Sequence, residues 1–146
     1  SLSVKSRDNA RTPMQWDDTS HAGFTEGIPW LPVNPNYLTL NAAAAVEDPN
    51  SVFHHFRKLI NLRHGYPVVV HGRFELLLPD HEQIWALTRT LDEQVLLMIA
   101  NCSSQPTIVP GDAVPDLTGA EMLLATHGDS TSLDLEPWES RIYLID

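Results

Sequence analysis

The pattern after Gly65 restricts the fold more than any other feature of the sequence. From there to the last residue, short runs of β-branched, aliphatic and aromatic residues alternate with turn signals such as Pro-Asp, Pro-Gly-Asp and His-Gly-Asp. These runs predict seven strands, at residues 68–78, 83–91, 94–101, 107–109, 120–126, 132–135 and 138–145. Short strands without helices between them are typical of an antiparallel β-sandwich, so a mainly β fold is expected. Residues 95–100 are apolar throughout, which predicts a central strand that is buried on both faces.

One helix is predicted before the β region, at residues 49–64. Asp48 is suited to cap it, Pro49 is suited to its first position, and Gly65 is suited to end it. Apolar side chains recur at helical spacing along one face: Val52, Phe53, Phe56, Leu59 and Ile60.

Residues 1–47 are predicted to be a long irregular segment. They contain four prolines and no sustained period of 2 or 3.6 residues, yet they are too apolar for a solvated linker. We therefore expect this segment to pack over something larger. The expected organisation is a loop and one α-helix in residues 1–67, followed by the sandwich in residues 68–146.

The length and the charge distribution exclude several classes of protein. A chain of 146 residues is too short for a complete (β/α)₈ barrel, which needs roughly 250. Residues 1–73 carry a formal charge of +1 and residues 74–146 carry −11. Because binding to phosphate backbones and anionic lipids depends on cationic side chains, neither nucleic acid nor a membrane is an expected partner.

Cysteine and histidine give no sign of a disulfide or a metal site. A single cysteine, Cys102, cannot form an internal disulfide, and its place after an apolar run predicts a buried, inert thiol. The seven histidines show no metal-ligand spacing, and no Gly-rich phosphate loop is present, so neither a metal nor a cofactor is expected. With no signal-peptide pattern and no long apolar run, a cytoplasmic location is expected.

Residues 6–18 hold the densest cluster of polar side chains. Arg7 and Arg11 lie four residues apart with Asp8 between them, so one guanidinium could face a polar ligand while the carboxylate orients it. On composition alone, a solvated turn with a surface ion pair is the better interpretation. Trp16 and Trp30 could stack on sugar rings, although large aromatic side chains more often simply pack.

The acids near this cluster do not suggest a catalytic pair. Glycoside hydrolysis needs two carboxyl groups on either side of the scissile bond. The candidates are Asp8, Asp17, Asp18 and Glu26, and nothing in their spacing singles out two of them.

Three segments of the sequence resemble the α-glucosidase branch of glycoside hydrolase family 13, most closely its oligo-1,6-glucosidase group. They are SRDNARTPMQWDD at residues 6–18, HAGFTEGIPWLPVNPNY at 21–37 and SVFHHFRKLINLRHGYPVVVHGRFELL at 51–77. The resemblance implies that the chain is the C-terminal part of such an enzyme. It would comprise the loop after the eighth barrel strand, the eighth barrel helix and the antiparallel β-sandwich called domain C.

The resemblance also implies roles for particular residues. Arg11, directly before Thr12-Pro13, matches the family arginine that hydrogen-bonds the glucosyl unit next to the scissile bond, while Arg7 and Asp8 match neighbours that shape the loop. The family's catalytic carboxylates lie in earlier motifs that are absent here, so this chain alone is expected to be inactive. Its parent would be a retaining enzyme that acts on short α-glucosidic oligosaccharides.

Two alternatives remain open. The chain could be a non-catalytic carbohydrate-binding module, with Trp85 and Trp138 stacking on sugars, or the equivalent part of a trehalose synthase or a sucrose isomerase. The sequence does not separate α-1,6 from α-1,4 specificity. Because one sandwich cannot cover all apolar side chains of the helix, the isolated chain is also expected to self-associate through the helix and the loop of Trp16, Phe24 and Trp30, or to fold that loop back over the helix.

Overall fold

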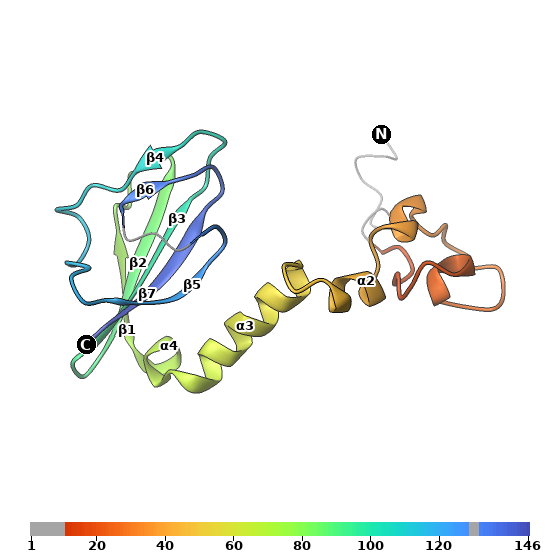
Figure 1. The fold of residues 1–146 in the computed structure, drawn as a ribbon, viewed down its shortest axis with the longest axis horizontal. Helices are drawn as coiled ribbons and strands as arrows, with labels where there is room; N and C mark the ends of the chain where they lie inside the picture. The colour runs from red at the N-terminus through yellow and green to blue at the C-terminus, as the bar shows by residue number, and fades with distance from the viewer. Residues whose placement is uncertain (1–10, 129–131) are drawn as a thin grey trace. The chain divides into compact units, whose positions relative to one another are not determined.

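The computed structural model describes residues 11–128 and 132–146. The chain divides into two compact units, Ser1–Arg57 and Lys58–Asp146, and the division falls inside helix α3 (Val52–Gly65) (Figure 1). Each unit is described below by itself. The domain boundary between residues 67 and 68 stays a prediction.

The second unit is built on a five-stranded antiparallel sheet with a two-stranded sheet beside it. The strands of the large sheet, in spatial order, are β1 (Arg73–Leu77), β2 (Ile84–Leu91), β3 (Gln94–Asn101), β7 (Ser140–Ile145) and β5 (Glu121–Ala125). The small sheet pairs β4 (Thr107–Ile108) with β6 (Asp134–Leu135). The expected mainly antiparallel β fold is confirmed, and β3 is the central strand that the apolar run at 95–100 predicts.

The main core lies between these two sheets. Alternate residues of β2, β3 and β7 point to it, and the β4 and β6 segments add Val109 and Leu135. Its buried members are Ile84, Ala86, Leu97, Ile99, Val109, Leu135 and Tyr143. The opposite face of the large sheet is called the outer face below.

The prediction of one strand over residues 68–78 is wrong in its first half. Pro67–His71 form a short helix, α4, and β1 begins only at Arg73. Pro67 occupies the first turn of the helix, where its fixed φ is favourable, and Val68 is fully buried against Leu96 and Leu144 of the outer face. Burial of Val68 therefore outweighs the β propensity of the Val-Val-Val run.

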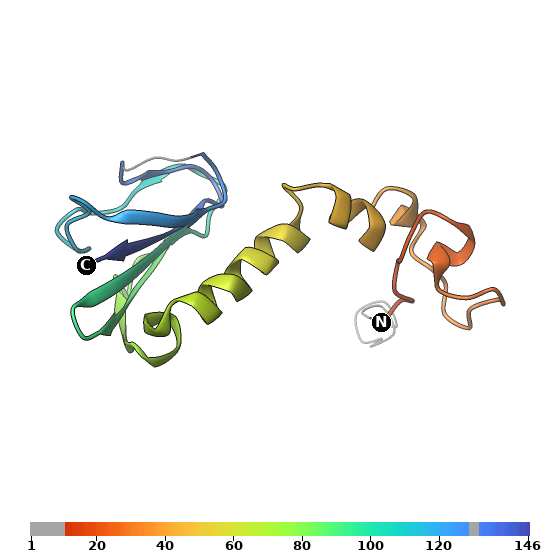
Figure 2. The ribbon, with the colours of Figure 1, turned by 60° about the horizontal axis from the view of Figure 1, so that its bottom comes forward.

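Arg89 fastens α4 to the sheet. From β2, its guanidinium donates hydrogen bonds to the carbonyl oxygens of Val68 (3.3 Å), Val70 (3.2 Å) and Gly72 (2.8 Å), so a cation satisfies the C-terminal end of the helix. Gly72 is required by close packing, since a Cβ there would lie 2.5 Å from the Val68 oxygen and 3.0 Å from the Arg89 Cβ. In both views α4 lies at the end of the large sheet where β1 begins (Figures 1 and 2).

Helix α3 begins three residues later than the sequence predicts. Its first residue is Val52, and the Ser51 hydroxyl accepts a hydrogen bond from the His54 amide at 3.4 Å. Asp48 instead ends the preceding helix, and its carboxylate accepts a hydrogen bond from the Asn50 amide at 2.9 Å. No residue of α3 is buried, and Val52 and Phe56 are 85% and 62% exposed.

The first unit is mainly irregular, as expected, but it contains a helix that the sequence analysis missed. Helix α2 (Ala42–Glu47) follows two 3₁₀ turns, η2 (Ser20–Gly23) and η3 (Pro35–Leu38). Asn41 caps α2 by accepting a hydrogen bond from the Ala44 amide at 2.8 Å. Four consecutive alanines after a capping asparagine are a propensity signal that a search for amphipathic periods does not detect.

A buried ion pair joins β7 to the β6 segment. The Arg141 Nε and the Glu139 Oε1 are 2.6 Å apart, and their side chains are 3% and 2% exposed. Arg141 also donates to the carbonyl oxygens of Ser132 (2.6 Å) and Asp134 (2.8 Å), and the Glu139 carboxylate accepts from the Glu136 amide at 2.8 Å. Both charges are therefore fully hydrogen-bonded, as burial requires.

This network makes the stability of the β unit dependent on pH. Burial alone raises the pKa of Glu139, but hydrogen bonds from Arg141 and the Glu136 amide outweigh it and bring the pKa below its ordinary value of 4.5. Because the folded-state pKa is the lower one, the stabilisation is present above the ordinary pKa and is lost as pH falls through the folded-state pKa.

We predict that Glu139→Gln destabilises the chain by about 3 kcal/mol at pH 7, because Arg141 keeps a buried charge without its counterion. The difference from the unsubstituted chain should shrink as pH falls below the ordinary pKa of the carboxyl. Urea unfolding at several pH values measures both effects. Glu136→Gln, at an exposed neighbouring acid, is the matched control and should change stability by less than about 0.5 kcal/mol. Equal losses in the two variants would contradict the role of the pair.

Candidate functional site

Arg11 is exposed and lines a small pocket of the first unit. The pocket has a volume of about 210 Å³ and is formed by Arg11–Met14 together with Phe24 and Pro29–Leu31. The pocket therefore brings together Arg11 and two aromatic residues, Phe24 and Trp30. Arg7 and Asp8 lie outside the described residues, so their predicted proximity to Arg11 stays a prediction.

The segment that follows Arg11 is held by the start of α2. The carbonyl oxygens of Gln15 and Trp16 accept hydrogen bonds from the amides of Ala42 and Ala43, each at 2.9 Å. The Gln15 side chain also donates to the Leu40 carbonyl. These are amides of the first helical turn, which have no partner inside a helix. The helix that the sequence analysis missed therefore fixes the backbone of the Pro-Met-Gln-Trp segment.

A tight turn closes the same segment from the other side. The Ala22 carbonyl accepts hydrogen bonds from the Trp16 and Asp17 amides, at 2.9 and 3.3 Å, and Ala22 is fully buried. His21, Ala22 and Gly23 have φ values of 57°, 59° and 64°, so three successive residues are in the left-handed region. That conformation is unfavourable for residues with a Cβ and needs support from its surroundings.

Asp17 supplies part of that support. Its carboxylate accepts hydrogen bonds from the Thr19 hydroxyl and the Thr19 amide, the latter at 2.9 Å, and these bonds lower the pKa of Asp17. A Cβ on Gly23 would lie 2.7 Å from both carboxylate oxygens. Asp17 is therefore engaged in holding the turn, which is a structural role.

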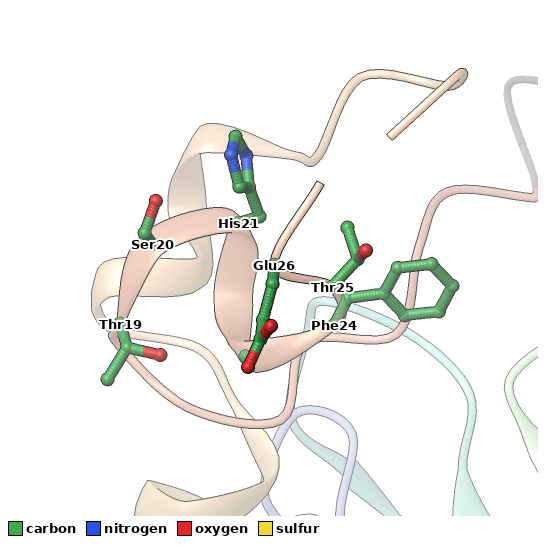
Figure 3. Close-up of a pocket in the computed structure, with 7 residues that line it drawn as sticks. Thr19, Ser20, His21, Phe24, Thr25 and Glu26 are labelled. Atoms are coloured by element: carbon green, nitrogen blue, oxygen red, sulfur yellow. The ribbon is translucent and has the colours of Figure 1, made fainter. Parts of the chain in front are cut away.

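Residues 19–26 also border a pocket of their own, which does not bring a catalytic acid and base together. It is lined by Thr19, Ser20, His21 and Gly23–Glu26 and has a volume of about 430 Å³. Figure 3 shows the His21 ring and the Glu26 carboxylate pointing in opposite directions from the turn. Only one acid, Glu26, lines this pocket.

A larger, mainly apolar groove of about 1050 Å³ crosses the first unit. Its apolar side chains come from the Pro-Met-Gln-Trp segment, from α2 and from the first turn of α3, and they include Met14, Trp16, Leu40, Val46 and Phe53. These five are between 45% and 63% exposed, and Trp30, outside the groove, is 83% exposed. Within this chain, the unit that carries Arg11 therefore leaves much of its apolar surface uncovered.

In the β unit, the exposure of Cys102 differs from the expectation. Cys102 is exposed, so the prediction of a buried thiol is wrong, because the residue follows β3 instead of lying within it. It shares a pocket of about 390 Å³ with Trp85 and Leu76. Trp85 is 52% exposed on β2, and Trp138, in the turn before β7, is 64% exposed with a φ of 60°.

Among residues 11–128 and 132–146, no three His, Cys, Asp or Glu side chains are grouped so that they could hold a metal ion. The His54 ring lies 2.8 Å from the carbonyl oxygen of Val46, a contact within the first unit. In the same described ranges, no helix is both long and apolar enough to cross a membrane.

Comparison with known proteins matches the first half of the chain to a family model and nearly the whole chain to curated relatives. Residues 1–72 match the model of the α-amylase catalytic domain, so the match ends at Gly72, between α4 and β1. The oligo-1,6-glucosidase of Halalkalibacterium halodurans is 46% identical over 149 residues, which cover 99% of this chain and 27% of that protein.

Solved structures give the same result. The trehalose-6-phosphate hydrolase of Bacillus licheniformis aligns with a TM-score of 0.87 and 36% identity, covering 98% of this chain and 27% of that one. A trehalulose synthase aligns with a TM-score of 0.86 and 37% identity, covering 99% and 27%.

The fold and these matches define a segment of a protein of the α-amylase type. The chain belongs to the α-amylase family, glycoside hydrolase family 13, as the Arg-Thr-Pro-Met-Gln-Trp segment and its neighbours indicate. It spans about a quarter of the length of the curated relatives that it matches. Sequence reasoning missed the structural roles of Asp17 and of the cap Asn41, which accept hydrogen bonds from Thr19 and from the Ala44 amide, because such local contacts have no motif of their own.

We predict that Gly23→Ala loosens the turn at residues 16–24. The left-handed φ costs alanine roughly 1–2 kcal/mol, and its Cβ would displace the Asp17 carboxylate. Limited proteolysis with peptide mapping should show cleavage in this turn about 5- to 30-fold faster than in the unsubstituted chain. Gly27→Ala is the control, because its Cβ would find its nearest neighbour at 3.8 Å. Unchanged cleavage of Gly23→Ala would show that Asp17 does not hold the turn.

Proposed function

We propose that this chain is the C-terminal part of a retaining α-glucosidase that cleaves short α-glucosidic oligosaccharides, and that Arg11 binds the reacting sugar. The observation that carries the proposal is the small pocket that Arg11 lines together with Phe24 and Trp30. Similarity to an oligo-1,6-glucosidase over 99% of the chain supports the same substrate class.

The chemistry of the pocket suits a pyranose ring. A guanidinium presents several donors in a planar fork and can hold two hydroxyl oxygens at once, while an aromatic face contacts the apolar face of the ring. Arg11 would act by binding and orienting the sugar next to the scissile bond. A hydrogen bond that strengthens as charge develops on that sugar lowers the barrier as well as the dissociation constant.

The two carboxyl groups of a retaining reaction are proposed to come from the rest of the parent enzyme. Such enzymes place a nucleophile and an acid about 5 Å apart, and the reaction passes through a covalent glucosyl-carboxylate. Near Arg11, the Asp17 carboxylate accepts a hydrogen bond from the Thr19 amide. Among the described residues, no pair of acids lines the pocket of Arg11. We therefore expect the chain alone to be inactive, while supplying the parent with a substrate-binding arginine and a stabilising β domain.

A second candidate function is the isomerisation of a disaccharide. The likeness to a trehalulose synthase is as high as the likeness to a trehalose-6-phosphate hydrolase, so either reaction type is compatible with the segment present here. The alternative of a carbohydrate-binding module depends on Trp85 and Trp138, which come from different elements of the β unit.

Three further expectations stay predictions. They are the absence of nucleic-acid and membrane partners, self-association of the isolated chain, and a cytoplasmic location.

The role of Arg11 is tested in the complete enzyme. Arg11→Ala should lower kcat/KM on isomaltose or maltose by about 30- to 1,000-fold, which corresponds to loss of roughly 2–4 kcal/mol from a charge-assisted hydrogen bond. Arg11→Lys should restore little, because it keeps the charge but loses the fork.

Arg73→Ala is the matched control for this experiment. Arg73 forms only a 3.5 Å surface pair with Glu75, and its side chain is 75% exposed. This variant should stay within a few-fold of the unsubstituted enzyme, with unchanged thermal stability in all three variants. An Arg11→Ala enzyme of normal activity would place the arginine outside the sugar site.

A further inference from the structure

Arg11 lies on a segment that has no regular secondary structure of its own. Residues 11–16 belong to no helix or strand, and among them Pro13 alone has a fixed φ. A side chain on such a segment keeps one position only where other parts of the chain hold its backbone. A binding group has to stay within about 0.5 Å of the productive geometry. The contacts that hold this segment therefore affect whatever Arg11 binds.

Two of these contacts come from the first turn of α2. The Ala42 amide donates to the Gln15 carbonyl oxygen, and the Ala43 amide donates to the carbonyl oxygen of Trp16, each at 2.9 Å. Because both bonds join residues that are neighbours in the chain, they fix the direction of the segment as well as its position. The bonded residues follow Arg11 by only four and five positions. The first turn of α2 is therefore an anchor close to the arginine.

Asn41 organises that first turn. Its Oδ1 accepts a hydrogen bond from the Ala44 amide at 2.8 Å, and its Nδ2 donates to the Tyr37 carbonyl oxygen at 2.9 Å. Its own carbonyl oxygen accepts from the Ala45 amide at 3.0 Å. A helix of six residues is too short to be stable by itself, so its first turn depends on such contacts. Asn41 thus joins the end of η3 to the start of α2.

We propose that Asn41 is a positioning residue for Arg11, which acts through the amides of Ala42 and Ala43 and does not itself touch the sugar. The inference rests on the proposed function, since it takes Arg11 as the residue that binds the reacting sugar. Without the cap, the first turn of α2 frays and releases the two carbonyl oxygens that it holds. The arginine then occupies its competent position for only part of the time, which raises the apparent dissociation constant of the sugar by the same factor.

The test is a double-mutant cycle in the complete enzyme. Asn41→Ala should raise KM on isomaltose or maltose and lower kcat/KM about 2- to 30-fold, which is the factor that corresponds to the loss of one N-cap. Asn41→Ser should restore most of this loss, because serine caps a helix about as well as asparagine. In an enzyme that already carries Arg11→Ala, Asn41→Ala should change kcat/KM by less than about twofold, because the side chain that it positions is gone.

Ala42→Pro separates the positioning of the segment from the stability of α2. Ala42 is the first residue of the helix, where proline is favourable, and Asn41 before it is already extended, as a residue before proline prefers. The substitution removes the amide that holds Gln15 but keeps the cap. We expect KM to rise and kcat/KM to fall at least about threefold, with Tm unchanged within about 2 °C. A mere loss of folded enzyme would instead lower the apparent kcat at constant KM.

Asn34→Ala is the matched control, because it is the same substitution at another cap of the same unit. Asn34 caps η3 by accepting a hydrogen bond from the Asn36 amide at 3.2 Å. This variant should keep kcat/KM within about twofold. Hydrogen exchange in the complete enzyme supplies a readout without activity. The amides of Ala42 and Ala43 should exchange at least about fivefold faster in Asn41→Ala, and at an unchanged rate in Asn34→Ala.

Several outcomes would overturn the proposal. They are equal losses from Asn41→Ala with and without the arginine, a fall in kcat at constant KM, normal kinetics of Ala42→Pro, or unchanged exchange of the two amides. Failure of the proposed function gives a different result, because Arg11→Ala alone would then keep normal activity, and the positioning role would fall with it. Where Arg11→Ala is impaired but the losses multiply, only the positioning role of Asn41 is removed.

Discussion

The contact between Arg89 and the end of α4 is the interaction on which the arrangement of the second unit depends. One guanidinium satisfies three carbonyl oxygens of the helix end, and the missing side chain of Gly72 lets the backbone approach β2 closely. This joint lies where the match to the catalytic-domain model ends. A cation and a glycine thus hold α4, the last element of that match, against the outer face of the large sheet.

The sequence predicts the fold well where a residue's environment is set by its own strand. The apolar run at 95–100 became the central strand, and, apart from the strand predicted at 68–78, the strands lie within about two residues of their predicted bounds. The prediction fails where contacts with residues that are distant in the chain determine the local structure. Val68 is in a helix because it packs against Leu96 and Leu144 and because Arg89 binds the helix end. These partners lie some 20 to 80 residues away in the chain, and nothing in the Val-Val-Val run indicates them.

The candidate site likewise combines a residue that the sequence predicts with residues that it does not. Arg11 was found through a long motif, and its pocket is built from residues of that motif and the segment at 21–37. The residues that hold the segment in place, Asp17, Ala22 and Asn41, act mainly through backbone groups and were not predicted as a set. Exposed Trp30 had two interpretations in the sequence, as a sugar platform or as a packing residue. In the structure, Trp30 lines the same pocket as Arg11.

We propose that this chain contributes sugar binding and stability to a glucosidase whose catalytic carboxylates lie elsewhere in the enzyme. Hydrolysis of p-nitrophenyl α-glucoside, measured side by side for the purified 146-residue chain and for the complete enzyme, tests it most directly. Turnover is expected from the complete enzyme, and none above background is expected from the chain, even at high protein concentration. Turnover that follows the isolated chain through every purification step would contradict it.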